Sequence, residues 1–268
     1  MAGYPKALTI AGSDSGGGAG IQADLKTFSA CKVYGASVIT AITAQNTVGV
    51  TAVQELSADL VKAQIDAVLS DIKPQAIKIG MLFSPPIIET VAAALSTYDG
   101  AVVLDPVMIA KSGDALLQDD AIDTLIRHLL PRVDLITPNL PEAARLLGMS
   151  DATDLIALEA QGHALLDLGA KAVLMKGGHA EGATCTDLLI TNDAPTLSLS
   201  SPRINTRNTH GTGCTYSAAI AANLASGQAL PDAVESAHAY LQIAIATADT
   251  LHIGQGHGPV HHFHEMWT

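Results

Sequence analysis

One stretch of the chain decides how the rest is interpreted: Arg207-Asn208-Thr209-His210-Gly211-Thr212-Gly213-Cys214-Thr215-Tyr216-Ser217-Ala218-Ala219-Ile220-Ala221-Ala222. Glycines and threonines lead directly into an alanine-rich segment, which predicts a tight loop that becomes the first turn of a helix. The unpaired amides and the positive dipole end of such a helix attract a phosphate or a developing oxyanion. Gly211 and Gly213 would let the backbone approach that anion closely. We therefore expect this turn to bind an anion.

Cys214 lies at the positive end of this expected helix. A helix N-terminus can lower the pKa of a thiol from about 8.5 to roughly 3.5–7.5. The sequence therefore predicts that Cys214 is available as a base or a nucleophile near neutral pH. The alternative is a small residue buried beneath the turn, because free cysteine is among the most buried residue types.

Upstream of this stretch, short apolar or β-branched runs alternate with segments of helical spacing. We expect strands at 6–11, 37–45, 76–80, 101–105, 135–137 and 172–176, and helices at 21–31, 59–69, 87–95, 119–129, 140–147, 155–168 and, after the turn, 233–250. This alternation predicts an α/β fold built on a mostly parallel sheet. Segments 186–191 and 196–199 flank an Asn192-Asp193 turn and predict a small hairpin at the edge of the sheet. No repeat or linker interrupts the pattern, so we expect residues 1–268 to form a single domain.

The composition excludes several classes of protein. With 48% hydrophobic and 15% charged residues the chain is typical of globular proteins, and its formal net charge of −12 argues against nucleic-acid binding. Its apolar runs are short and interrupted, so we expect no membrane span. The three cysteines are far apart and the first residues lack a long apolar region. We therefore expect a cytoplasmic protein with reduced cysteines and no zinc site.

A glycine-rich segment, 12–20, follows the first expected strand. Within it and the next helix, residues 18–23 (GAGIQA) match the relaxed dinucleotide fingerprint G-x-G-x-x-A. The acidic residue that should follow about 20 positions later is missing, because residues 37–53 contain no Asp or Glu. No Gly is followed directly by Lys, which also excludes a P-loop. If the protein uses a nucleotide, it binds it in another way.

Charged residues occur where the expected strands end or helices begin. Asp105 and Glu142 supply oxygen ligands of the kind that suit magnesium, although Glu142 could simply favour the first turn of a helix. Lys176 ends an apolar strand, where a cation would meet a phosphate; the alternative is a lysine whose head reaches solvent at the sheet edge. The four histidines His257, His261, His262 and His264 fit no zinc pattern, so we expect them to form a surface tail.

Taken together, these residues resemble the ribokinase-like superfamily, and within it the hydroxymethylpyrimidine/phosphomethylpyrimidine kinases of thiamine biosynthesis. The resemblance covers the whole chain through segments 7–14 (ALTIAGSD), 22–27 (QADLKT), 43–47 (TAQNT), 78–81 (KIGM), 105–108 (DPVM), 211–214 (GTGC) and 256–264 (GHGPVHHFH). It implies a three-layer αβα fold in which helices flank a central, mostly parallel sheet. Most of the superfamily carries Asp where this chain has Cys214, and the pyrimidine kinase branch carries Cys.

The resemblance also implies the activity and the site. The activity would be ATP-dependent phosphorylation of 4-amino-5-hydroxymethyl-2-methylpyrimidine and then of its monophosphate, with ATP and Mg²⁺ and in a homodimer. The implied substrate residues are Gly12, Asp24, Gln45, Met81 and Val107; the catalytic residues are Gly211, Thr212, Gly213 and Cys214; Lys176 and Thr209 would bind ATP, and Asp105 and Glu142 the metal. A Gln amide has one acceptor and two donors, which suits an aminopyrimidine edge. Lys111 is expected on a lid over the phosphates.

Three other functions remain open from the sequence. A pyridoxal or pyridoxine kinase acts on a similar ring with a hydroxymethyl arm. Cys214 with His210 would suit a nucleophile pair for acyl transfer, which trapping by an acyl donor would reveal. A noncatalytic protein that binds the ring would show tight pyrimidine binding without ADP formation.

Overall fold

A nine-stranded sheet forms the centre of the part that the computed structural model describes, residues 3–108, 117, 120–179 and 182–267. Its strand order is β3-β2-β1-β4-β5-β6-β7-β8-β9. The strands are β1 Lys6–Asp14, β2 Tyr34–Gln45, β3 Val50–Glu55, β4 Ala76–Ile79, β5 Ala101–Leu104, β6 Leu135–Ile136, β7 Ala172–Met175, β8 Thr184–Thr191 and β9 Leu197–Pro202. From β2 to β7 all neighbours are parallel, whereas β3, β8 and β9 pair antiparallel at the two edges.

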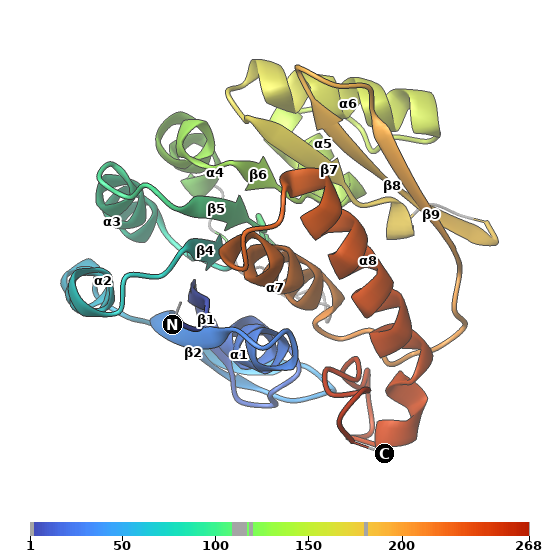
Figure 1. The fold of residues 1–268 in the computed structure, drawn as a ribbon, viewed down its shortest axis with the longest axis horizontal. Helices are drawn as coiled ribbons and strands as arrows, with labels where there is room; N and C mark the ends of the chain where they lie inside the picture. The colour runs from blue at the N-terminus through green and yellow to red at the C-terminus, as the bar shows by residue number, and fades with distance from the viewer. Residues whose placement is uncertain (1–2, 109–116, 118–119, 180–181, 268) are drawn as a thin grey trace.

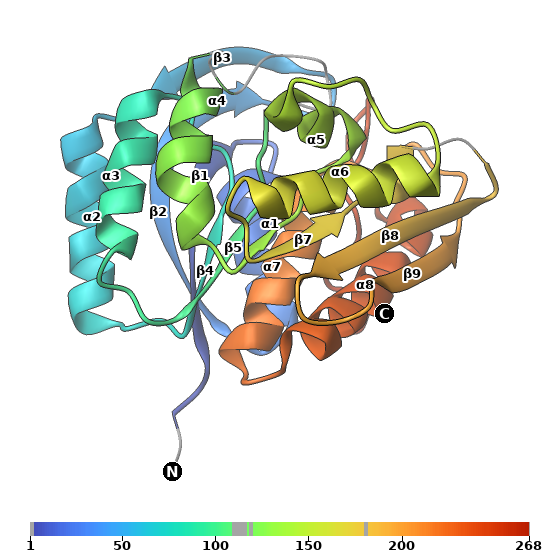
Figure 2. The ribbon, with the colours of Figure 1, turned by 90° about the horizontal axis from the view of Figure 1, so that it is seen from above.

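Helices cover both faces of this sheet (Figures 1 and 2). They are α1 Gly20–Ala30, α2 Ala58–Asp71, α3 Pro85–Leu95, α4 Ala121–Thr124, α5 Leu140–Leu147, α6 Leu155–Asp167, α7 Thr212–Ala225 and α8 Leu230–Ala246. Side chains of α2, α3, α5 and α6 share one core with the sheet, and those of α1, α7 and α8 share another. Central strands are apolar on both faces as a result, and full burial of a side chain such as Ile77 contributes about 1.5–3 kcal/mol.

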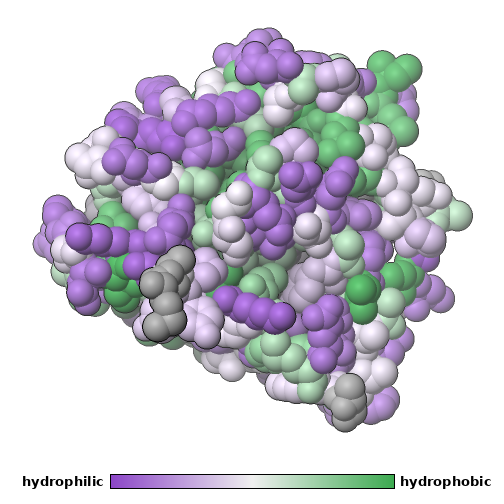
Figure 3. All heavy atoms as spheres, viewed as in Figure 1, coloured by the Kyte–Doolittle hydropathy of each residue, from purple (hydrophilic) through white to green (hydrophobic). Residues whose placement is uncertain are grey.

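The outer surface over α7 and α8 shows hydrophilic residues between smaller hydrophobic areas (Figure 3). Among the helices of the described residues, none combines the length and the apolar character needed to cross a bilayer.

The predicted parallel sheet, its flanking helices and the β8–β9 edge hairpin are confirmed. The sequence did not predict β3, and β1 runs three residues further than expected, to Asp14. Most residues of β3 are exposed, so this edge strand lacks the apolar pattern that marks the others. The helix expected at 119–129 begins at Ala121 and continues as a π-helical turn over Leu125–Leu129.

The expected surface tail of histidines is wrong for two of its members. His261 and His262 are each 5% exposed, whereas His257 is exposed and His264 is intermediate. Thr215 Oγ1 lies 3.1 Å from His262 Nε2, and Tyr240 donates a hydrogen bond to the His262 carbonyl oxygen at 2.7 Å. The C-terminal segment therefore packs against the start of α7 and helps to hold the glycine turn in place.

Candidate active site

A cavity of about 1050 Å³ opens where the central parallel strands end and α7 begins. Its walls include twelve of the predicted site residues: Gly12, Gln45, Met81, Asp105, Val107, Glu142, Lys176, Thr209, Gly211, Thr212, Gly213 and Cys214. The carboxyl ends of parallel strands meet at one edge of a sheet, which is why residues so far apart in sequence converge here. Asp24, the remaining predicted site residue, is fully buried behind this wall.

The glycine turn is held close to the glycine-rich segment after β1. Gly211 has a φ of +79°, and a Cβ atom there would overlap the carbonyl oxygen of Gly18. Helix α7 begins directly afterwards, and in the described structure no side chain caps its first amides. Gly213 and Cys214 line the cavity, so the positive end of α7 faces it.

A lysine and two carboxylates lie directly beneath the turn. Lys176 Nζ is 2.8 Å from Asp105 Oδ1 and 3.9 Å from Glu142 Oε2. A Cβ atom on Gly213 would come within 3.3 Å of both Asp105 Oδ2 and Lys176 Nζ. Burial raises the pKa of Glu142 to about 7, against the opposing effect of Lys176. The absence of a side chain at Gly213 thus allows the ion pair to approach the first turn of α7.

Glu142 also has a structural role, which the sequence offered as the alternative. Its Oε2 accepts a hydrogen bond from the Asn139 amide at 2.8 Å, while Asn139 Oδ1 accepts one from the Glu142 amide. This capping box starts α5 and fixes the carboxylate at the cavity wall. The structural role of Glu142 is therefore confirmed, and its role as a metal ligand stays a prediction.

Lys78 is a residue that sequence reasoning did not assign to the site. It is completely buried on β4, lines the cavity and donates to Asp24 Oδ2 at 3.0 Å. Thr9 donates to the same oxygen at 2.6 Å. Burial opposes the charge on Lys78, but Asp24 and other nearby anions raise its pKa above the ordinary value. A lysine within an apolar strand was the available signal, because a buried lysine needs a charged partner.

The amides of the glycine-rich segment are directed at a side chain of the protein itself. Asp14 accepts hydrogen bonds from the amides of Gly16, Gly18 and Ala19 at 2.8, 3.1 and 2.8 Å. Burial opposes ionisation, but the hydrogen bond with His210 and those with the amides lower the pKa of Asp14. These amides are therefore occupied, which agrees with the rejection of the dinucleotide fingerprint.

At the other end of the cavity a polar group faces a small apolar wall. Met81 packs with Ala41, Phe83 and Val107, and a Cβ atom on Gly12 would lie 2.9 Å from the Met81 sulfur. Gln45, the last residue of β2, places its amide nitrogen 3.4 Å from His210 Nε2. His210 in turn lies 2.8 Å from Asp14 Oδ2. Apolar faces beside one amide are suited to a flat, polar-edged ring.

The expectation of a lowered Cys214 pKa is wrong. Burial raises the pKa of the thiol to about 11, although Lys78 and the Gly20 amide act in the opposite direction and Asp24 and Asp105 reinforce the increase. The side chain keeps partial exposure to the cavity, but protein atoms surround it elsewhere. Cys214 is therefore a neutral thiol at pH 7 in the free protein.

This environment predicts a specific pH dependence of alkylation. Because only the thiolate reacts, labelling of Cys214 by iodoacetamide should accelerate about tenfold per pH unit from pH 7 to 10. The same cysteine in urea-unfolded protein should instead level off above roughly pH 8.5. Peptide mass spectrometry measures both rates, and a plateau below pH 8 in the folded protein would contradict the raised pKa.

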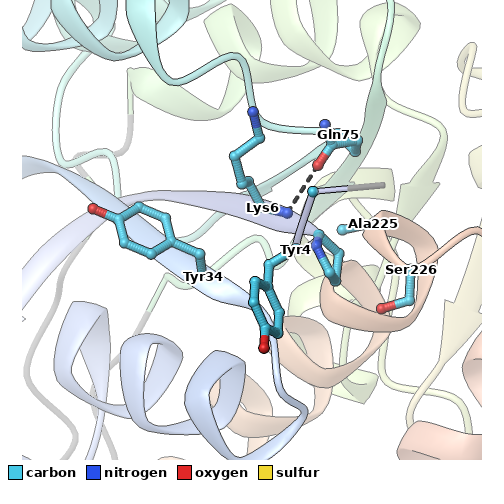
Figure 4. A pocket seen from close by; sticks show the side chains of 8 residues that line it. Tyr4, Lys6, Tyr34, Gln75, Ala225 and Ser226 are labelled. Atoms are coloured by element: carbon cyan, nitrogen blue, oxygen red, sulfur yellow. Dashed lines mark hydrogen bonds between the residues drawn. The ribbon is translucent and has the colours of Figure 1, made fainter. Parts of the chain in front are cut away.

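Other predicted or possible sites lie elsewhere. Lys111, expected on a lid, falls outside the described residues. A second cavity, about 850 Å³, lies at the opposite end of the sheet, where Tyr4, Lys6, Tyr34 and Gln75 line it (Figure 4). It contains none of the predicted site residues. Within the described chain, no group of three or more His, Cys, Asp or Glu side chains could hold a metal by itself.

Known proteins are similar to this chain in sequence and in fold. Residues 14–261 match the family model described as phosphomethylpyrimidine kinase. The chain is 58% identical to the hydroxymethylpyrimidine/phosphomethylpyrimidine kinase of Rhizobium meliloti, over 97% of this chain and 98% of that protein. It is 48% identical to the thiamine biosynthesis bifunctional protein ThiED of Geobacter sulfurreducens, over 95% of this chain and 51% of that protein. An ADP complex of Bacillus subtilis pyridoxal kinase is similar with a TM-score of 0.91 and 35% identity, covering 99% and 100% of the two chains.

Proposed function

This chain belongs to the phosphomethylpyrimidine kinase family, and from that premise we propose how its cavity carries out the family's reaction. The protein is a phosphotransferase that phosphorylates 4-amino-5-hydroxymethyl-2-methylpyrimidine and then its monophosphate, a reaction of thiamine biosynthesis. The observation that supports the assignment of roles is the convergence of Gln45, the 211–214 turn and Lys176 on one cavity. As a kinase of this family it uses ATP as the phosphoryl donor.

We place the pyrimidine at the end of the cavity that Gln45 occupies. Gly12, Met81 and Val107 would contact the ring faces, and the Gln45 amide would pair with its polar edge. Asp24 does not line the cavity. Its predicted role as a substrate ligand stays a prediction. Its contact with Lys78 supports an indirect role instead.

The phosphoryl group would move between the glycine turn and the lysines. Gly211, Thr212 and Gly213 line the same space as Lys176 and Lys78. Phosphoryl transfer needs positioning and charge neutralisation more than a strong base. A site that holds the largely buried side chains of Lys176 and Lys78 in place before the substrates bind meets both requirements. Thr209 would contact ATP beside Lys176.

The residues present fit a magnesium ion completed by ATP. Asp105 and Glu142 offer carboxylate oxygens at one wall, and magnesium in kinases usually takes one or two carboxylates with phosphates and waters. Lys176 contacts both carboxylates, so their negative charge is partly balanced in the free protein. When bound, the ion would neutralise charge on the phosphates.

Replacing Cys214 by alanine should impair the first phosphorylation more than the second. The hydroxymethyl acceptor of the first step has a proton to lose, whereas the phosphate acceptor of the second step needs no base. With a thiol pKa of about 11, a base role requires the bound substrates and Lys78 to favour the thiolate. We expect a loss of roughly a hundredfold in the first step and less than about tenfold in the second. Separate rates for the two acceptors test this, and equal losses would exclude a base role.

Pyridoxal kinase activity is the second candidate, because the chain resembles a pyridoxal kinase structure over its whole length. The family match and the higher identity to pyrimidine kinases favour the pyrimidine. Product ratios with the hydroxymethylpyrimidine and pyridoxal in competition measure the preference. A larger kcat/KM for pyridoxal would overturn the assignment.

Phosphorus NMR tests the activity itself. With magnesium-ATP and the hydroxymethylpyrimidine, ADP and pyrimidine monophosphate should appear first and the pyrimidine diphosphate later. ATP consumption without a second product would restrict the enzyme to the first step. No phosphorylated pyrimidine would contradict the function.

Three further predictions concern the context of the enzyme. We propose that the chain acts as a single kinase domain in the cytoplasm and as a homodimer. Ile42 and Val48, 48% and 71% exposed around β2 and β3, are hydrophobic residues that a second copy would cover. Light scattering in solution measures the molar mass, and a monomer at micromolar concentration would contradict the dimer.

A further inference from the structure

The amide of Gln45 lies between two polar side chains that limit how it can be oriented. Its Nε2 is 3.4 Å from His210 Nε2, and its Oε1 is 3.1 Å from Thr43 Oγ1. Thr43 also donates to the Ser13 carbonyl oxygen at 2.9 Å, so its one hydroxyl proton already has a better acceptor. The orientation of the amide therefore depends on where the proton of His210 is.

Asp14 decides the position of that proton. Its Oδ2 lies 2.8 Å from His210 Nε2, and its two oxygens accept three backbone amides. Its pKa is lowered, so it is an ionised acceptor at neutral pH. A carboxylate can only accept, and His210 must therefore carry a proton on Nε2 and donate it to Asp14.

Two donors cannot face one another across a short polar contact. The Nε2–H of His210 and the amide NH₂ of Gln45 would do so in the orientation given above. Rotating the Gln45 amide by 180° exchanges its oxygen and nitrogen, which differ little in position. The oxygen then faces the Nε2–H of His210 and accepts the longer branch of a three-centre hydrogen bond whose shorter branch goes to Asp14, and the NH₂ donates to Thr43 Oγ1. Every polar group in the chain Asp14, His210, Gln45, Thr43, Ser13 now has a complementary partner.

His210 is held rigidly enough to impose this choice. Its side chain is buried, and a Cβ atom on Gly18 would overlap the ring. Its amide donates to the Gly258 carbonyl oxygen at 3.0 Å, and its carbonyl oxygen accepts from Val260 at 3.3 Å. The glycine-rich segment and the C-terminal segment therefore fix the ring from two sides.

We propose that His210 is a positioning residue for substrate specificity, which fixes the Gln45 amide with its oxygen toward His210 and its NH₂ toward Thr43. One lone pair on the Gln45 amide oxygen and one N–H on its amide nitrogen then remain for a ligand, and the positions of this acceptor and this donor are fixed. A 4-aminopyrimidine has an amino donor at C4 beside an acceptor ring nitrogen, and this pair matches the fixed acceptor and donor of the Gln45 amide. The 4-oxo analogue has an oxygen acceptor at C4 beside a ring N–H donor, so its donor and acceptor are exchanged. The inference rests on the proposed ring site at Gln45.

Nitrogen NMR of the histidine rings tests the proton position without any substrate. In the free protein at neutral pH, His210 Nε2 should carry a proton, with a one-bond coupling assigned by its loss in His210→Gln. His163, which is exposed, serves as the comparison. An unprotonated Nε2 on His210 would overturn the proposal.

Kinetics test the consequence for specificity. We compare kcat/KM for 4-amino-5-hydroxymethyl-2-methylpyrimidine with that for its 4-oxo analogue. His210→Phe removes the donor, so the preference for the amino compound should fall by about tenfold, mainly through KM. His210→Gln keeps an N–H near the same position and should retain the preference. If His210→Phe does not fold, as thermal melting would show, the NMR result and the retained preference of His210→Gln decide.

The controls separate the inference from the proposed function. Gln45→Leu should lose most of the preference, since it removes the amide. If wild type phosphorylates neither compound, the function fails and NMR still tests the proton. If wild type and Gln45→Leu behave as expected while folded His210→Phe keeps the full preference, His210 does not position the amide.

Discussion

Replacing Gly211 by alanine is expected to lower kcat/KM by at least about a hundredfold, the loss typical of a damaged oxyanion site. A Cβ atom at this position overlaps the Gly18 carbonyl oxygen, and both atoms belong to the backbone. Relief requires the turn to move away from the glycine-rich segment. Because Gly211 precedes α7, this movement displaces the first turn of α7, which lines the cavity. Steady-state kinetics of the first phosphorylation measures the effect.

Gly227→Ala is the matched control for this prediction. Gly227 has a φ of +88°, close to that of Gly211, but nothing lies within 4 Å of a Cβ atom there. The left-handed backbone should cost each variant about 1–2 kcal/mol of unfolding free energy, and Gly211→Ala should lose more because its Cβ atom also overlaps the Gly18 carbonyl oxygen. Activity should survive only in Gly227→Ala. Equal kcat/KM values in the two variants would show that the contact between turn and glycine segment is unimportant.

Replacing Lys78 by methionine is expected to destabilise the protein by about 3–5 kcal/mol. Lys78 and Asp24 are both 0% exposed, and the substitution leaves the Asp24 carboxylate without its cation. Asp24 Oδ1 has no hydrogen-bond partner among the described residues, so in the variant the hydrogen bond from Thr9 to Oδ2 is what remains to stabilise the carboxylate. Urea unfolding measures the change.

An exposed pair supplies the comparison. Lys62 and Asp66 lie 2.5 Å apart on α2 with side chains about 60% exposed, and Lys62→Met should change stability by less than about 1 kcal/mol. Adding Asp24→Asn to Lys78→Met should restore at least half of the loss, because the buried charge disappears. If Lys78→Met were no less stable than Lys62→Met, the buried pair would have no structural importance.

The sequence predicted the sheet because its central strands are apolar and bounded by clear helices. It missed β3 because an exposed edge strand has no such pattern. The ends of β1, β2 and β5 carry polar residues, and parallel strands bring those ends together. Twelve predicted residues therefore reached one cavity, although the resemblance to known kinases supplied most of their roles.

Contacts between distant segments account for what the sequence could not show. The partner of Lys78 is 54 residues away, and the environment of Cys214 depends on residues from α1, from β4 and from the position directly after β5. Helix position alone predicted a low thiol pKa, whereas burial dominates in the folded protein. The buried C-terminal histidines likewise acquire their role only through contacts with α7.

A crystal structure with ADP, aluminium fluoride, magnesium and the hydroxymethylpyrimidine tests the central claim most directly. The fluoride group, which mimics the transferring phosphoryl, should lie on the amides of residues 211–213, with the hydroxymethyl oxygen on its far side and the ring edge at Gln45. A fluoride group bound away from this turn, or a ring bound away from Gln45, would contradict the account.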